Sequence, residues 1–359
     1  MEKTKVVHIT ETFVSGVYTY IRQLTDFCSK DDRIESFVIY SSVRIETNIE
    51  LIKNEFSPNV VLKCINMTRE ISPWKDLKSL IKIILEIRKI KPDVVHVHSS
   101  KAGVLGRIAV LVYPKAKLFY TPHGYSFIRE DISQNKKKRY YILEKLITKI
   151  FGGTIIACGD FEFSEAKKLG KTVLIRNGVD VDLVSKYSFK NCNKNYSIGT
   201  SGRISVQKNP KLFNEIALKN PNVQFVWIGD GDLRPLLNAS NIMITGWKSY
   251  DETLKLVSDF DVFLSTSSWE GLPFNIIEAM VLSKPIISSN IAGNKPTVIE
   301  SENGFLCDNI QDYNKAIQIL EDLIKREQFG KKSFEVAKEF FNMNKNFKEL
   351  IQLYIGKHA

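Results

Sequence analysis

The sequence contains no uncharged apolar run of the ~18 residues that a membrane-spanning helix requires, so we expect no transmembrane segment. Cysteine is scarce: the five cysteines are scattered and form no Cys-x-x-Cys pair. This excludes a zinc ribbon and favours a reducing compartment. The N-terminus runs directly into Val6-Val7-His8-Ile9, without the long apolar core or small-residue cleavage site of a signal peptide. We therefore expect a cytoplasmic protein.

Basic residues, in contrast, are in excess, and they are unevenly distributed. The net charge is +11 over 359 residues. Residues 1–180 contain 30 Lys and Arg against 20 Asp and Glu, whereas residues 181–359 contain 21 against 20. A chain of this length fits two domains better than one. A basic half and a nearly neutral half predict two domains that meet different partners.

Short β-branched runs alternate with helical patterns in both halves. In the first half we expect strands at 5–10, 36–41, 60–65, 93–99, 118–123, 154–158 and 173–177, with helices near 16–30, 76–90, 102–112, 137–151 and 160–169. In the second half we expect strands at 196–202, 224–229, 242–246, 262–267, 285–290 and 304–307. Continuous apolar strands alternating with helices predict parallel sheets covered on both faces.

The predicted fold class is therefore α/β, with two Rossmann-like doubly wound parallel-sheet domains facing each other across a cleft. We place the first domain at 1–182 and the second at 196–335, with a polar linker between them. The helical tail, 336–359, is expected to pack back on the first domain. Open α/β sheets bind ligands at the carboxyl ends of their strands. The residues that follow each strand are therefore the functional candidates.

Two cations follow the first strand of the second half. Arg203 and Lys208 precede Asn209 and Pro210, which are typical of the N-cap and first turn of a helix. Cations between a strand end and a helix start suit a diphosphate, because charge-assisted hydrogen bonds contribute about 1.5–3 kcal/mol each. Two solvated loop cations are the alternative interpretation.

Two glutamates follow a later strand, in Glu270-Gly271-Leu272-Pro273 and, eight residues on, at Glu278. Pro273 suits the first turn of a helix, whose free N–H groups make an anion site. Glu278 lies about one turn further in, or ~6 Å along the axis, which matches the step from a pyrophosphate to its ribose. Glu270 can accept hydrogen bonds from a second polyol. Alternatively, both glutamates are ordinary surface residues.

Together, Gly202-Arg203, Lys208 and Glu270-x7-Glu278 resemble the retaining nucleotide-sugar glycosyltransferases of family 4, which have the GT-B fold. The resemblance implies that Arg203 and Lys208 hold the donor diphosphate, that Glu278 binds the ribose, and that Glu270 binds the sugar hydroxyls. It adds a donor-binding segment made of Gly271 and the backbone amides of Leu272, Phe274 and Asn275. Pro273 has no amide where many relatives carry glycine, so one hydrogen-bond donor to the sugar is missing.

The resemblance also assigns residues of the first half. Gly16, in a turn that opens a helix, would lie on the donor phosphate side. His123, which follows a strand, would contact the donor sugar near the reacting carbon, as an orienting group rather than a general base. His96 and His98 point to one face of a strand. They form a conceivable metal pair without a visible third ligand, and structural histidines are the alternative; His98 is also our candidate for acceptor binding.

The expected reaction needs no metal and no other cofactor. Two Asp-x-Asp matches, Asp180 with Asp182 and Asp230 with Asp232, could hold a divalent metal on a diphosphate. However, the cations already assigned to the diphosphate can neutralise it. The resemblance implies retention of the donor's α configuration, from a nucleotide-sugar (UDP-sugar favoured) to a saccharide or lipid-linked acceptor. Bacterial capsule, O-antigen or exopolysaccharide synthesis is the expected setting.

The basic residues of the first half leave two interpretations open. The helix at 77–91 and the run at 136–141 are either solvated faces or a surface attracted to anionic lipid, by about 1 kcal/mol per cation near the membrane. The second would place the protein peripherally on the inner face of the plasma membrane. Rival functions are a nucleotide-sugar epimerase of the same fold and a non-enzymatic polyanion binder. We expect no nucleic-acid partner, because no helix-turn-helix or stacking platform is present.

Overall fold

The chain divides into two structural units. The computed structural model describes residues 2–43, 52, 54–68, 70, 72–188 and 196–356. One unit comprises residues 1–175 and 345–359, and the other comprises residues 176–344. Residues 189–195, within the expected polar linker, lie outside the described part. Within that part, no helix combines the length and apolar character that crossing a membrane demands.

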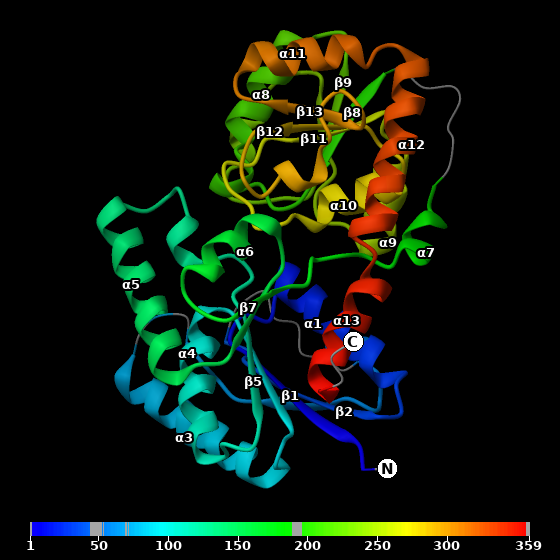
Figure 1. Cartoon of the computed structure of the whole chain (residues 1–359). Helices are drawn as coiled ribbons and strands as arrows, with labels where there is room; N and C mark the ends of the chain where they lie inside the picture. Colours follow the sequence, from blue (N-terminus) through cyan, green and yellow to red (C-terminus); the bar gives the residue numbers. More distant parts are fainter. Residues whose placement is uncertain are drawn as a thin grey trace. The chain divides into compact units, whose positions relative to one another are not determined.

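The first unit is built on a seven-stranded parallel sheet, as the alternating pattern predicts (Figure 1). The order is β3-β2-β1-β4-β5-β6-β7, and the bounds are β1 Thr4–Thr10, β2 Ile34–Tyr40, β3 Val61–Cys64, β4 Val94–His98, β5 Lys117–Thr121, β6 Thr154–Ala157 and β7 Thr172–Leu174. The central strand β4 is buried along its whole length. Thr10, His98 and Thr121 are in register across β1, β4 and β5, so the segments after these strands emerge side by side.

Helices cover both faces of this sheet. α3 (Pro73–Ile90), α4 (Ser100–Ala109) and α5 (Gln134–Phe151) form one layer, with α4 in the middle, and α6 (Asp160–Lys167) follows beside β6 and β7 (Figure 1). α4 approaches the sheet closely: a Cβ on Gly106 would lie 2.3 Å from Cγ1 of Val97. α1 (Ser15–Ser29) runs from β1 to β2, in the opposite direction along the sheet, which places it on the other face.

The second unit has a six-stranded parallel sheet in the order β10-β9-β8-β11-β12-β13. The strands are β8 Ser197–Ser201, β9 Gln224–Ile228, β10 Ile242–Ile244, β11 Val262–Ser265, β12 Ile286–Ser289 and β13 Gly304–Cys307. One buried cluster joins the sheet to α8 (Pro210–Lys219) and α11 (Ile310–Ile319). Another joins it to α7 (Val181–Ser185), α9 (Tyr250–Ser258), α10 (Phe274–Val281) and α12 (Leu323–Phe340). The predicted fold class, two doubly wound parallel sheets with C-terminal helices, is confirmed.

The chain crosses between the units twice. Residues 176–182, expected at the end of the first domain, belong to the second unit, because Val179 and Val181 are buried in its core. Gly178 allows this crossing: a Cβ there would lie 2.5 Å from the carbonyl oxygen of Phe341. Residues 336–344 of the expected tail also belong to the second unit, because Val336 and Ala337 are buried in its core. The last helix, α13 (Met343–Ile355), belongs to the first unit from Lys345 on. There Phe347 packs edge-on against Tyr20 of α1, with ring centroids 5.5 Å apart.

Candidate active site

The loop after β8 carries the two predicted phosphate-binding cations. Arg203 is exposed, and Lys208 ends a short 3-10 turn (Val206–Lys208). Asn209 then adopts a left-handed conformation (φ 50°) and caps α8, because its side chain accepts a hydrogen bond from the amide of Leu212; Pro210 occupies the first turn. The predicted cap is confirmed, and it fixes the backbone from which the Lys208 side chain projects.

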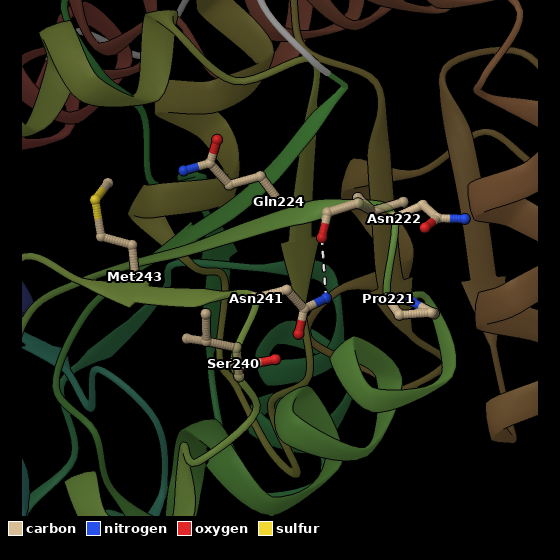
Figure 2. Close-up of a pocket in the computed structure, with 8 residues that line it drawn as sticks. Pro221, Asn222, Gln224, Ser240, Asn241 and Met243 are labelled. Carbon is tan, nitrogen blue, oxygen red and sulfur yellow. Dashed lines mark hydrogen bonds between the residues drawn. The ribbon is translucent and has the colours of Figure 1, made fainter.

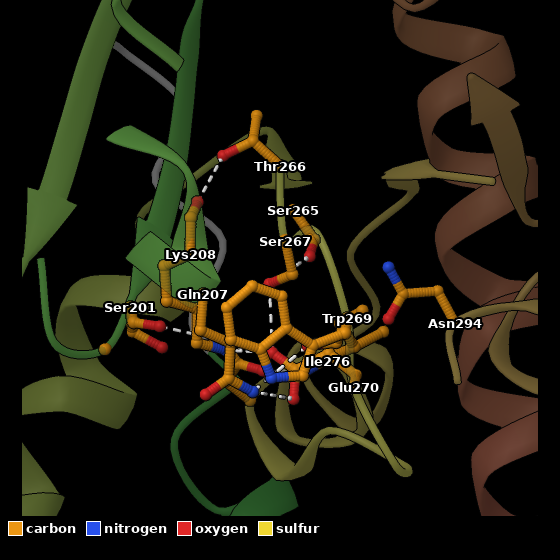
Figure 3. A network of polar contacts seen from close by, with 12 residues as sticks. Ser201, Gln207, Lys208, Ser265, Thr266, Ser267, Trp269, Glu270, Ile276 and Asn294 are labelled. Carbon is orange, nitrogen blue, oxygen red and sulfur yellow. Dashed lines mark hydrogen bonds and ion pairs between the residues drawn. The ribbon is translucent and has the colours of Figure 1, made fainter. Parts of the chain in front are cut away.

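Lys208 and Glu270 form an ion pair, with Nζ 2.7 Å from Oε1, although 62 positions separate them in the chain (Figure 3). Two further donors hold the same carboxylate. Nε2 of Gln207 lies 3.1 Å from Oε2, and Oγ of Ser267 lies 2.9 Å from Oε1. Both charged side chains are largely buried, at 19% and 10% exposed. The structure therefore brings together Lys208, assigned to the diphosphate, and Glu270, assigned to the sugar hydroxyls.

The second glutamate lies on α10, which begins one residue later than predicted. Pro273 is the extended N-cap rather than part of the first turn. The first amides of a helix lack partners within it, and in α10 these belong to Phe274 and Asn275. The Asn275 side chain donates to the carbonyl oxygen of Ser201, at 2.7 Å, which ties the start of α10 to the end of β8. The segment expected to meet sugar and phosphate is thus fixed beside the cation loop.

Glu278 is buried rather than on the surface of α10. Burial raises the pKa of its carboxyl to about 7, against smaller opposing effects from a hydrogen bond with Tyr250 and from the positive charge of Lys208. A buried carboxyl is costly to ionise, and a strongly shifted pKa marks a candidate functional group. Its position one turn from the free amides of α10 suits recognition of a ribose next to a diphosphate.

In the first unit, His123 follows β5 in a left-handed conformation, with φ 53°, and Gly124 continues the turn with φ 90°. Nε2 of His123 lies 3.0 Å from Nδ1 of His98, and the two rings are stacked. Burial lowers the pKa of His123 to about 3, so the imidazole is neutral near pH 7. Nδ1 of His123 lies 3.9 Å from Sγ of Cys158, so both ring nitrogens have a partner. A neutral ring held on both sides suits the predicted orienting role better than that of a general base.

The His123–Gly124 turn is held from behind by Glu162 of α6, which the sequence did not single out. The Glu162 carboxylate accepts hydrogen bonds from the amides of Gly124, at 2.7 Å, and Cys158, at 2.6 Å. Burial raises its pKa to about 7, although both amide hydrogen bonds oppose the shift. One buried carboxylate thus joins the ends of β5 and β6 at the turn that presents His123.

His98 is fully buried and lies behind His123. Its two ring nitrogens lie 3.0 Å from His123 and 3.1 Å from Nδ1 of His8, so its side chain does not project toward an acceptor. His96 is also structural: its nitrogens lie 2.6 Å from the Tyr354 hydroxyl and 2.7 Å from the Thr121 hydroxyl.

The structure places a third imidazole, that of His8, beside the conceivable metal pair His96 and His98. The sequence did not indicate this third histidine. Nitrogen atoms of His8, His96 and His98 lie within 4.8 Å of one another, a spacing that could hold a metal ion. However, both nitrogens of His96 and of His98 are within hydrogen-bonding distance of other groups. Burial depresses the pKa of all three, which keeps them neutral. The arrangement is a hydrogen-bonded core cluster that continues through His123 to Cys158.

Gly16 lies exposed in the first turn of α1, directly after the segment that follows β1. Because β1 and β5 end at the same edge of the sheet, Gly16 and His123 both belong to its carboxyl edge. The predicted residues therefore fall into two sets, one at this edge and one at the carboxyl edge of the second sheet.

A shallow pocket of about 320 Å³ lies elsewhere, at the start of β9 and β10 (Figure 2). Its lining contains no charged side chain, and the Asn241 amide in it donates to the carbonyl oxygens of Ala217, Asn220 and Val223. The lining residues precede or begin β9 and β10, so the pocket lies at the amino ends of these strands. Open parallel sheets bind ligands at the carboxyl ends of their strands. The pocket is therefore not the functional site.

Comparison with known proteins identifies the family. Residues 14–183 match the family described as Glycosyltransferase Family 4, and residues 186–336 match Glycosyl transferases group 1. The chain is also 31% identical to a UDP-Gal:alpha-D-GlcNAc-diphosphoundecaprenol alpha-1,3-galactosyltransferase of Escherichia coli, over 80% of this chain and 82% of that protein. The chain belongs to the family-4 glycosyltransferases.

Other proteins are similar to this family-4 glycosyltransferase along nearly its whole length. An uncharacterised 41.2 kDa protein from the cps region of Klebsiella pneumoniae is 29% identical, over 98% of both chains. Among solved structures, sucrose-phosphate synthase of Thermosynechococcus elongatus superimposes with a TM-score of 0.83 at 18% identity, covering 99% of both chains. Anabaena HepE in complex with UDP-glucose gives 0.78 at 19% identity, covering 98% of this chain and 100% of that one. At such identities these structures establish the fold.

Sequence reasoning missed the residues that hold the site in place. Gln207 and Ser267 supply two of the three donors to Glu270, and Gly293 allows close backbone approach, because a Cβ there would lie 2.2 Å from the Glu270 carbonyl oxygen. Gln207 could have been suspected from its place between the two cations. Glu162 and Gly293 carry no local signal, since each acts through a segment distant in sequence.

Proposed function

We propose that this glycosyltransferase transfers a sugar, with retention of configuration and without a metal ion, from a UDP-sugar to a hydroxyl of a lipid-linked saccharide. The observation that carries the proposal is the largely buried Lys208–Glu270 ion pair, which joins the loop that also contains Arg203 to the segment that leads into α10. The named relatives supply the substrate classes: UDP-Gal and a GlcNAc-diphosphoundecaprenol acceptor in Escherichia coli, and capsular polysaccharide in the Staphylococcus aureus protein CapM. Bacterial surface-polysaccharide synthesis on the inner face of the plasma membrane is the proposed setting.

The donor would bind mainly to the second unit. Arg203 and Lys208 would hold the diphosphate, with the amides of Leu272, Phe274 and Asn275 directed at phosphate and sugar. Glu278 would accept the ribose hydroxyls, and Glu270 with Gly271 would meet the hydroxyls of the sugar. In the first unit, Gly16 would lie near the phosphate, and His123 would orient the sugar near its reacting carbon. In this arrangement the residues that contact the nucleotide determine the affinity for the donor. The residues around the anomeric carbon of the sugar determine the rate of transfer.

In the proposed step, the bond between the anomeric carbon and the β-phosphate oxygen breaks as the acceptor hydroxyl oxygen bonds to that carbon on the same face. The hydroxyl proton passes to the leaving diphosphate, whose charge Arg203 and Lys208 stabilise. No carboxylate is then needed as a covalent nucleophile. Catalysis rests on positioning and electrostatic stabilisation of the leaving group.

Metal independence is supported by what the two Asp-x-Asp pairs do. Asp180 caps α7, and its carboxylate accepts from the amide of Leu183. Asp230 pairs with Arg234 at 2.8 Å and also accepts from the amide of Gly231. The first aspartate of each pair therefore has a structural role, and in the proposed site Arg203 and Lys208 would neutralise the diphosphate instead.

The test is a transfer assay with a UDP-sugar and a lipid-diphosphate-linked N-acetylhexosamine acceptor, with and without EDTA. We expect UDP release and a product whose anomeric NMR coupling shows the α configuration, at equal rates in both conditions. A β-linked product would contradict retention, and loss of activity in EDTA that added Mg²⁺ or Mn²⁺ restores would contradict metal independence. Conversion of the UDP-sugar without acceptor would instead support an epimerase.

A further inference from the structure

α3 is apolar on two opposite faces, and one of them faces solvent. Ile83 and Ile87 are buried against the core of the first unit. On the opposite side, four apolar residues three or four positions apart are between 48% and 79% exposed: Trp74, Leu77, Ile81 and Leu85. Isolated exposed apolar residues are ordinary, but a stripe along about three turns of one helix marks an interaction surface.

α5 repeats the pattern on the other side of α4. Glu144 and Thr148 are its buried positions. Four apolar residues on the remaining face are between 43% and 67% exposed: Ile142, Leu143, Leu146 and Ile150. Both stripes lie opposite the buried positions of their own helix, so both face away from the interior of the first unit. α3, α4 and α5 form one layer on its sheet (Figure 1).

Basic residues flank both stripes, and acidic ones do not oppose them. The exposed cations are Lys75, Lys78, Lys82, Arg88 and Lys89 on α3, and Lys136, Lys138, Arg139, Lys145 and Lys149 on α5. The three acidic side chains of these two helices are engaged elsewhere: Asp76 with Lys101, Glu86 with Lys63, and Glu144 with Tyr120 in the interior. The outer surface of α3 and α5 therefore combines exposed apolar side chains with flanking side chains that carry positive charge.

We propose that the outer faces of α3 and α5 form a docking surface for an anionic lipid bilayer, with the two apolar stripes inserted among the acyl chains and the cations at the phosphate level. Like charge on both partners disfavours a second copy of the chain as the occupant, whereas anionic headgroups complement the flanking cations. The inference rests on the proposed function and deepens it, because it names the partner that would bring the enzyme to a lipid-linked acceptor.

Vesicle binding of the full-length chain tests the proposal. We expect binding to phosphatidylcholine vesicles containing phosphatidylglycerol, weaker binding to pure phosphatidylcholine, and affinity that falls with added salt. Replacing Trp74, Leu77, Ile81 and Leu85 by serine should weaken binding at least tenfold, and each of Lys78→Gln and Lys82→Gln should weaken it up to about fivefold. Trp247→Ser is the matched control, since Trp247 is 62% exposed on the second unit, and it should leave binding unchanged.

Insertion has a direct optical signature. Brominated acyl chains should quench the tryptophan fluorescence of the wild type and of Trp247→Phe but not of Trp74→Phe. Equal binding of the serine variant and the wild type, or no binding to anionic vesicles, would overturn the proposal. So would a dimer that the serine substitutions dissociate, because that would identify a second copy as the occupant.

The proposed function is tested separately, with a water-soluble acceptor analogue. Unchanged transfer by the serine variant to this analogue, together with lost vesicle binding, supports the surface. If the wild type transfers sugar to the analogue but does not bind vesicles, the proposed docking surface is wrong and the proposed function is supported. If the wild type binds vesicles but transfers no sugar, the proposed function is wrong and the proposed docking surface is supported.

Discussion

Nζ of Lys208 lies 2.7 Å from Oε1 of Glu270, and the two charges neutralise each other in a largely buried position. The proposed roles use both partners, one for the leaving diphosphate and one for the sugar. A buried pair is strongly destabilised when one partner is removed, because the other charge is left uncompensated. Substitution of either residue is therefore expected to affect both stability and turnover.

Lys208→Ala should lower the rate of transfer about 100-fold, the usual effect of removing one group that stabilises developing negative charge. It should also lower the melting temperature, because Glu270 loses its ion-pair partner. Steady-state kinetics and thermal unfolding measure the two effects. Lys211→Ala, an exposed lysine three positions further along, is the control and should change neither. A Lys208→Ala enzyme with full activity would contradict the assignment.

Glu278 predicts a pH dependence of donor binding. Its pKa of about 7, raised by burial, means that the carboxylate which accepts the ribose hydroxyls forms only as the pH passes 7. Affinity for a UDP-sugar, whose diphosphate diester does not titrate in this range, should rise about tenfold from pH 6 to pH 8.

Isothermal titration calorimetry across this range, with matched variants, checks the Glu278 prediction. Glu278→Gln should bind more weakly and without the pH dependence, whereas Glu215→Gln, an exposed glutamate on α8, should behave as the wild type. A pH dependence that persists in Glu278→Gln would assign the titration to another group.

His123→Asn should reduce turnover by at least tenfold while leaving the affinity for UDP unchanged. Asparagine tolerates the left-handed backbone of this position, so the turn is preserved while the imidazole is lost. UDP is held by the second unit in the proposed site, which separates the two measurements. Comparison of kcat with the Kd for UDP provides the check, and undiminished kcat would remove His123 from the site.

Glu162→Gln should destabilise the fold, because an amide oxygen can replace only one of the two acceptors that serve Gly124 and Cys158. The expected loss is about 1–3 kcal/mol. The folded pKa of about 7 lies above the ordinary value of 4.5, so the unfolded state releases its proton first. This contribution to the free energy of unfolding is therefore fully present below pH 4.5 and decreases up to pH 7.

Urea unfolding at pH 5 and pH 8 measures that difference in wild type and variant. Glu162→Gln should lose the part of the pH dependence that this carboxyl supplies. Glu165→Gln, on the same helix but in a surface pair with Lys168, should change stability by less than about 1 kcal/mol at either pH. Identical pH slopes in wild type and Glu162→Gln would show that the buried carboxyl does not titrate as described.

The alternation of apolar strands with helices was sufficient to predict both sheets, because strands buried on both faces are rich in β-branched residues along their whole length, as in Val94–Val97. The cap at Asn209-Pro210 was also predictable, since capping depends on neighbouring residues. The start of α10 was placed one residue early, because proline is compatible with both the cap and the first turn.

Features that depend on contacts between distant segments were not predictable. The Lys208–Glu270 pair joins two loops, and Glu162 reaches a turn 38 positions away. α3 shows the same limit in another form. Its sequence is apolar around most of the helix, and only packing against the core shows that Ile83 and Ile87 are buried while Trp74 and Leu85 are exposed.

The most direct test of the donor site is a thermal-shift panel of UDP-, GDP-, ADP- and CMP-sugars on the wild type and on Glu278→Ala. We expect that UDP-sugars alone raise the melting temperature and that Glu278→Ala abolishes the shift. No shift with any nucleotide-sugar, or an equal shift in the variant, would contradict the assignment of Glu278 and its neighbours to the donor.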